Sequence, residues 1–106
     1  MGPTTIRIGY SDIPIEYTDL REEDTFGYFE FHPVPRIAVD HRLSPPYAAA
    51  TVLHEILEAT SAIYGLELSE GQVRTLETVL VGLVKENPEV VRGWMDQLTD
   101  EKDQSG

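Results

Sequence analysis

The segment from residue 44 to residue 65 reads SPPYAAATVLHEILEATSAIYG, and it decides the fold of the second half of the chain. Ser44 is a good N-cap, and the two prolines after it suit a first helical turn, where a missing backbone N–H costs nothing. Gly65 can adopt the left-handed conformation that ends many helices. The segment therefore predicts one long helix that ends at about Tyr64.

Two further helices are predicted downstream. Ser69 and Gln72 form the S-x-x-Q pattern of a capping box, which opens a helix that runs to about Glu86. Asn87 and Pro88 then open a third helix. Its apolar residues recur at helical spacing: Val90, Val91, Trp94 and Leu98. We expect the tryptophan of this set to lie in the core.

The first forty residues predict short β-strands instead. Apolar and polar residues alternate in IRIGY, residues 6–10, and in IPIEY, residues 13–17, which is the period of a half-buried strand. FGYFEF, residues 26–31, and RIAVD, residues 36–40, complete the set. We expect an antiparallel β-meander of three to four short strands. Pro14 cannot donate a ladder hydrogen bond, so its strand is predicted at an edge or a bulge.

The order of elements predicts an α+β domain, with a strand meander followed by three helices. A chain of 106 residues is long enough for one small domain, which we place at residues 1–98. The remaining residues, 99–106, read TDEKDQSG and are predicted to be a disordered tail because they are uniformly polar.

Composition limits the partners of this domain. The chain has 19 acidic and 8 basic residues and a net charge of −11, which disfavours direct binding to nucleic acids or anionic membranes. We therefore expect a peptide or protein partner. The absence of cysteine excludes disulfides and thiolate zinc sites and fits a reducing cytoplasm. We recognise neither a membrane span nor a secretion signal, and the pattern leaves the oligomeric state open.

The long helix has a polar stripe beside its apolar face. At about 100° per residue, His54, Glu55 and Glu58 fall within about 100° of one another. By itself, such a stripe is typical of any amphipathic surface helix. The i, i+4 spacing of His54 and Glu58 also places the two side chains one turn apart, with room for one ion between their tips.

The second helix favours the metal interpretation of this stripe. Glu77 falls in the same row as Val73 and Leu80, where a carboxylate is costly unless it is paired, hydrogen-bonded or bound to a cation. The short connection at residues 65–69 can fold this helix back against the first one. We therefore expect Glu77 to meet the imidazole of His54.

Three stretches together resemble the zincin metallopeptidases: LHEILEA at residues 53–59, TLE at residues 75–77 and RIAVD at residues 36–40. The arrangement is most similar to the gluzincins, whose third zinc ligand is a glutamate on the following helix. It also resembles small zincin-like proteins encoded by bacteriophages and bacteria. The usual zincin motif is HExxH, whereas this chain has HExxE because Glu58 stands at the place of the second histidine.

The resemblance implies that His54, Glu58 and Glu77 bind zinc and that Glu55 acts as general base. A ligand set with one imidazole and two carboxylates is harder than the usual one, so manganese or iron would also be accepted. In zincins a strand beside the cleft pairs with an extended substrate, and residues 26–40 hold the candidate strand, with ordinary sheet core as the competing interpretation.

Three functions follow from these patterns. The first is a zinc-dependent peptidase or related hydrolase with Glu55 as base. The second is a catalytically inactive zincin-like binding or regulatory module of the phage type, which acts through its acidic surface. The third, an acidic mimic of a nucleic acid, rests on charge alone. We predict a cytoplasmic location, in the host cytoplasm if the protein is phage-encoded. His32 and His41 are expected at the surface, away from the site.

Overall fold

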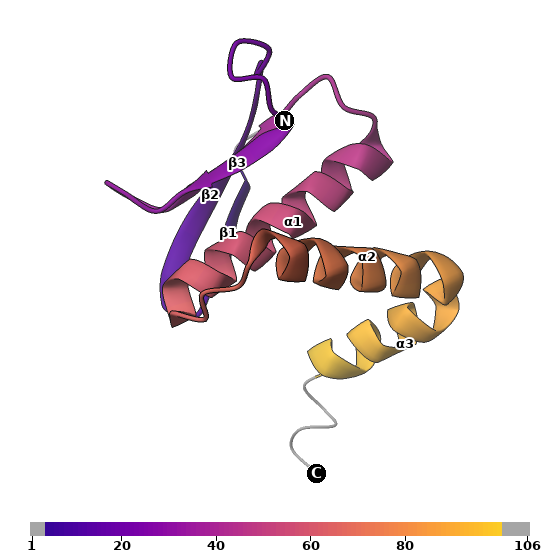
Figure 1. Ribbon diagram of the computed structural model, residues 1–106. Coiled ribbons are helices and arrows are strands. Elements are labelled where there is room, and N and C mark those ends of the chain that lie inside the picture. The colour runs from indigo at the N-terminus through magenta and orange to yellow at the C-terminus, as the bar shows by residue number, and fades with distance from the viewer. Residues whose placement is uncertain (1–3, 101–106) are drawn as a thin grey trace.

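The computed structural model describes residues 4–100, which form four strands followed by three helices (Figure 1). The elements are β1 (Thr4–Ile8), β2 (Ser11–Thr18), β3 (Gly27–Glu30), β4 (Arg36–Asp40), α1 (Pro45–Tyr64), α2 (Glu70–Glu86) and α3 (Pro88–Thr99). The predicted α+β class is confirmed. The predicted tail at residues 99–106 lies almost entirely outside the described residues, and Thr99 itself belongs to α3.

The strands form one mixed sheet in the order β1-β2-β4-β3. The pairs β1–β2 and β3–β4 are antiparallel, whereas β2 and β4 are parallel. The purely antiparallel meander was therefore wrong in this detail. The edge or bulge predicted for the strand of Pro14 was also wrong, because β2 lies inside the sheet and pairs with β1 in a continuous register. Pro14 is tolerated there because pairing with β4 begins only at Ile15.

The composition of β4 explains why it lies inside the sheet. Ile37, Ala38 and Val39 are consecutive and all buried, a pattern typical of a strand flanked on both sides. The four residues of β3 are all partly exposed, which suits a strand at the edge. A meander would have placed β4 at the edge and left its apolar run uncovered.

Helix α1 lies across one face of the sheet and contacts β1, β3 and β4 (Figure 1). The buried core joins Ala59 of this helix to isoleucine and valine side chains of the two central strands: Ile13, Ile15, Ile37 and Val39. The helix begins after Ser44 and ends at Gly65, whose φ of 65° is left-handed, as predicted. This packing fixes the face that α1 turns toward β3.

Helices α2 and α3 lie outside this core. Helix α2 packs on α1, and α3 packs on α2 (Figure 1). The capping box of Ser69 and Gln72 is present, as predicted. Val73 is the one buried residue of α2, and α3 has none, so Trp94 is half exposed and the expectation that it lies in the core was wrong. Within residues 4–100 no helix combines the length and the apolar character needed to cross a membrane.

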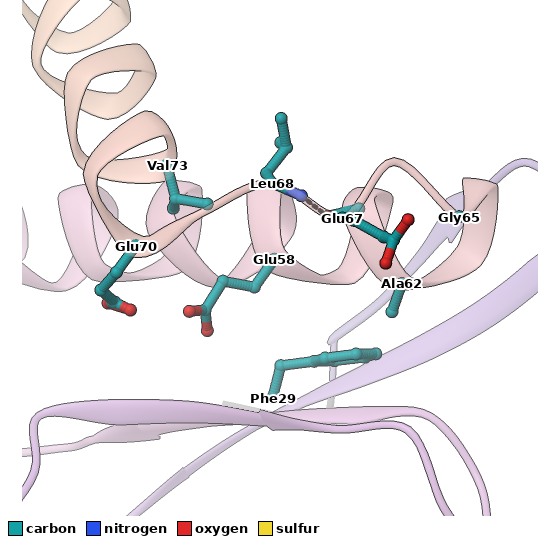
Figure 2. A pocket seen from close by; sticks show the side chains of 9 residues that line it. Phe29, Glu58, Ala62, Gly65, Glu67, Leu68, Glu70 and Val73 are labelled. Atoms are coloured by element: carbon teal, nitrogen blue, oxygen red, sulfur yellow. Dashed lines mark hydrogen bonds between the residues drawn. The ribbon is translucent and has the colours of Figure 1, made fainter.

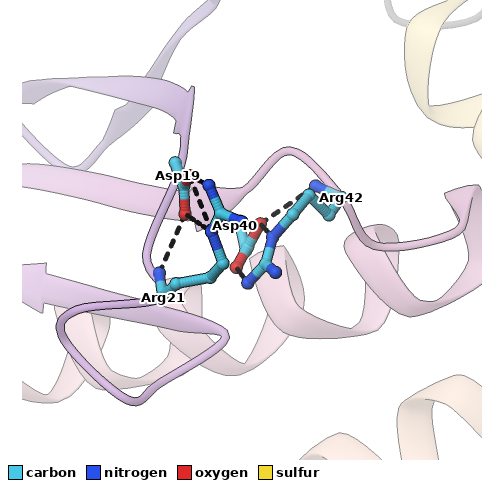
Figure 3. A network of polar contacts seen from close by, with 4 residues as sticks. All are labelled: Asp19, Arg21, Asp40 and Arg42. Carbon is cyan, nitrogen blue, oxygen red and sulfur yellow. Dashed lines mark hydrogen bonds and ion pairs between the residues drawn. The ribbon is translucent and has the colours of Figure 1, made fainter.

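Two acid–arginine pairs lie at the ends of β2 and β4 (Figure 3). Asp40, fully buried at the end of β4, accepts hydrogen bonds from the backbone N–H and the guanidinium of Arg42. Asp19 makes the same pairing with Arg21. The hydrogen bonds from Arg42 hold the pKa of Asp40 well below its usual value of 3.8. The aspartate of RIAVD thus has a structural role in the fold.

Candidate metal centre

Helix α1 presents three titratable side chains toward the gap between β3 and α2. The His54 side chain is 18% exposed, Glu58 is partly buried, and Glu55 is buried with 4% of its surface exposed. Gly27 of β3 lies against Glu55, because a Cβ placed on this glycine would be 3.6 Å from Glu55 Oε2. Glu55 therefore lies beneath the edge strand, deeper than the solvent-facing stripe predicted from the sequence.

The buried carboxyl group of Glu55 is incompletely satisfied. Its Oε1 atom has no hydrogen-bond partner among the described residues. Burial, followed by the nearby carboxyl group of Glu58, raises the pKa of Glu55 to about 8. A buried carboxyl oxygen without a hydrogen-bond donor is costly, so the Glu55 side chain lowers the stability of the folded state.

Helix α2 is brought back to α1 by a short turn that is anchored on a buried serine. Ser61 accepts hydrogen bonds from two backbone N–H groups of the turn: that of Leu66 to its carbonyl and that of Leu68 to its hydroxyl. Two acids of α2, Glu70 and Glu77, then face His54. They are seven residues apart, which places them on the same face of the helix, two turns from each other.

The imidazole of His54 meets these acids through its two nitrogens separately. Nδ1 lies 2.7 Å from Glu77 Oε1, within hydrogen-bond distance. Nε2 lies 3.7 Å from Glu58 Oε1 and also 3.7 Å from Glu70 Oε1. The expected encounter of Glu77 with the histidine ring is therefore present in the structure.

Three of these groups are close enough together to share one metal ion. His54, Glu55 and Glu58 each offer one ligand atom, and these atoms lie within 4.8 Å of one another. All four residues predicted for the site thus lie together, with Glu77 on the far side of the imidazole ring.

Sequence reasoning missed Glu70. Its only signal was the seven-residue spacing from Glu77, and an acid in the first turn of a helix is expected anyway because it favours the helix dipole. The position of Glu70 beside the imidazole depends on how α2 packs against α1, which spacing along one helix does not reveal.

The residues of the site line a cleft of about 630 Å³ between β3, α1 and α2. Arg74 is the sole guanidinium or ammonium group among the described side chains that line it. A second hollow of about 410 Å³ is also lined by Glu58 and Glu70, and their carboxylates point from the helices toward the sheet (Figure 2). The cleft is therefore strongly acidic. His32 and His41 are both exposed, as predicted, and do not line either hollow.

No protein family, curated protein or solved structure was found to match this chain. The resemblance to zincins therefore stays a prediction from the sequence.

Proposed function

We propose that this protein binds a divalent metal ion between α1 and α2 and uses Glu55 as the general base of a hydrolytic reaction, with a peptide as the substrate. His54 and Glu58 of α1 and a carboxylate of α2 would hold the ion. The observation that supports this most directly is the buried Oε1 atom of Glu55, which lacks a partner beside His54 and Glu58. An ion or a reacting water is the type of group that such an atom would contact.

The charges around the cleft fit a cation. Four carboxyl groups converge on one imidazole: Glu55, Glu58, Glu70 and Glu77. The one guanidinium, that of Arg74, is 71% exposed and lies 3.9 Å from Glu70, so screening by solvent leaves most of the negative charge uncompensated. A divalent ion would relieve the repulsion and satisfy the oxygen atoms together.

The protein residues have separate tasks in this proposal. A divalent ion in the site supplies Lewis-acid polarisation of a carbonyl group. Glu55 would accept a proton from the attacking water and pass it to the leaving amine. This task needs the ionised carboxylate, which the positive charge of an ion would favour by lowering the pKa that burial and Glu58 raise to about 8. The edge strand β3, which borders the cleft, offers free backbone groups to an extended peptide.

Metal content and cleavage test separate parts of the proposal. Protein purified without added metal should contain about one equivalent of zinc, manganese or iron by elemental analysis, and His54→Ala should lose it. Glu55→Gln should keep the ion and lose cleavage of unstructured peptides. Glu86→Gln is a matched control, because it removes one exposed acid at the other end of α2. Unchanged metal content in His54→Ala would show that the ligand set is wrong.

A second function, a metal-holding module without turnover, is favoured by two observations. Glu58 replaces the second imidazole of the motif and adds negative charge, which weakens an ion as a Lewis acid. Arg74 lines the cleft and lies 3.9 Å from Glu70, so its guanidinium group can compete with an ion for this carboxylate. Metal-loaded wild-type protein that cleaves no peptide from a random library would favour this module, which would bind a partner through its acidic surface. A cytoplasmic location stays a prediction.

A further inference from the structure

We propose that Glu70, at the start of α2, is the ligand that this helix gives to the metal, and that Glu77 acts as a positioning residue that orients the His54 ring. This inference rests on the proposed metal site and divides its acids into two roles. The geometry points to an ion on the Nε2 side of the imidazole, between His54, Glu58 and Glu70. Glu77 would remain on Nδ1, outside the coordination sphere.

The distances separate the two kinds of contact. Two ligand atoms that each lie about 2.1 Å from the same metal ion are roughly 3.0–3.5 Å apart. The two separations of 3.7 Å from Nε2 to Glu58 and Glu70 are close to this spacing and need only a small closure. The 2.7 Å separation of Nδ1 from Glu77 is that of a strong hydrogen bond. Each carboxylate is therefore near the spacing of two ligands of one ion that is bound to Nε2, and a proton fits between Nδ1 and Glu77. Glu70 is outside the group of His54, Glu55 and Glu58 whose ligand atoms all lie within 4.8 Å of one another, so it would have to move closer to Glu58 when the ion binds.

The hydrogen bond to Glu77 also selects one tautomer of the neutral ring. A carboxylate can only accept a hydrogen bond, so Nδ1 must donate its proton to Glu77. In the neutral imidazole this leaves a lone pair on Nε2, the nitrogen that faces Glu58 and Glu70. A carboxylate on the second ring nitrogen is the usual way in which a protein orients a metal-binding histidine.

The surroundings of the acids agree with this division. Glu58 and Glu70 line both hollows of the site, and Figure 2 shows both carboxylates on the side of the helices that faces the sheet. Glu77 lines only the larger hollow. The buried oxygen of Glu55 is the independent sign that a ligand belongs here, because its carboxyl group lies within 4.8 Å of ligand atoms of His54 and Glu58.

Zinc titration of wild-type protein labelled with ¹⁵N-histidine tests the assignment directly. Long-range ¹⁵N spectra report which ring nitrogen carries the proton, and His54→Ala identifies the signals of this ring. We expect the metal-free ring to be protonated on Nδ1 and zinc to shift Nε2 while the Nδ1 proton stays. Loss of the Nδ1 proton on zinc binding would overturn the division, although the metal site would stand. Absence of any zinc binding would overturn the proposed function itself.

Three glutamine variants supply a second measurement that does not depend on activity. Glu70→Gln should lower the affinity for Co²⁺ by more than about 100-fold and change the visible absorption bands of the bound cobalt. Glu77→Gln should lower the affinity by about 10–100-fold, keep the bands and move the ring proton toward Nε2. Glu86→Gln should change neither. Wild-type affinity and bands in Glu70→Gln would exclude it as a ligand. Circular dichroism shows whether each variant is folded. If one of them is not, the zinc titration of the labelled wild-type protein tests the assignment by itself.

Discussion

Replacement of Glu55 by glutamine should stabilise the metal-free protein near neutral pH, although it removes the proposed general base. The side chain is buried, its Oε1 atom has no donor, and its pKa is raised from 4.5 to about 8. Glutamine has nearly the same shape and no charge to desolvate. A gain in stability on loss of a reactive group is the expected sign of a site that is strained for function.

The magnitude follows from proton linkage. Below about pH 4.5 the carboxyl group is protonated in both the folded and the unfolded chain, so its ionisation has no effect on stability. Between pH 4.5 and about 8 only the unfolded chain loses the proton, and each pH unit destabilises the fold by about 1.4 kcal/mol. This amounts to about 3 kcal/mol at pH 7. An incompletely satisfied amide would cost about 1 kcal/mol, which leaves a net gain of about 2 kcal/mol.

Urea unfolding of chelator-treated protein, followed by far-UV circular dichroism, measures this gain. Fluorescence is less suitable because the one tryptophan, Trp94, is half exposed on α3. The difference in unfolding free energy between Glu55→Gln and wild type should grow from pH 5 to pH 8 and then level off. Glu86→Gln should show no such trend. A difference that does not vary with pH, or a variant less stable than wild type at pH 7.5, would refute the reasoning.

Three further predictions concern the frame that holds the site. Gly27→Ala should destabilise the fold by about 1–3 kcal/mol in urea titration, because the new Cβ would lie 2.6 Å from Thr51 Cγ2, and adding Thr51→Ser should recover part of the loss. Ile37→Ala should cost about 2–5 kcal/mol by the same assay, since this side chain is completely buried in the core. Asp40→Asn should lower the melting temperature at pH 7. The advantage of wild type should persist above about pH 4 and disappear as acidification protonates Asp40, because the contribution of a carboxyl group with a lowered pKa is lost only as the pH falls through that value.

Local signals in the sequence were sufficient to predict the helices. The ends of α1, at Ser44 and Gly65, and the capping box at Ser69 depend on backbone groups that neighbouring residues satisfy, so spacing along the chain reveals them. The encounter of Glu77 with His54 was also predictable, because a short turn leaves α2 few ways to pack against α1.

The features that the sequence did not reveal depend on contacts between distant segments. Alternation predicted the strands but carried no information on order, so the insertion of β4 beside β2 was missed. The burial of Glu55 is set by β3, whose glycine at position 27 lets the backbone approach α1. Glu70 was overlooked because an acid at a helix start has an ordinary local explanation.

Two acidic side chains are buried among the described residues, and their surroundings differ in a way that bears on function. Asp40 accepts hydrogen bonds from the backbone N–H and the guanidinium of Arg42, so the fold itself compensates for its burial. Glu55 has an oxygen without a donor, and its neighbours include three further acids and one imidazole. We expect leucine or glutamine at this position to give a more stable fold, so the stability of the core does not explain the acid. An interaction of the carboxyl group within the site has to explain it. A cation held by His54 would supply that interaction. Acids that repel one another without an ion would each be attracted to the bound cation.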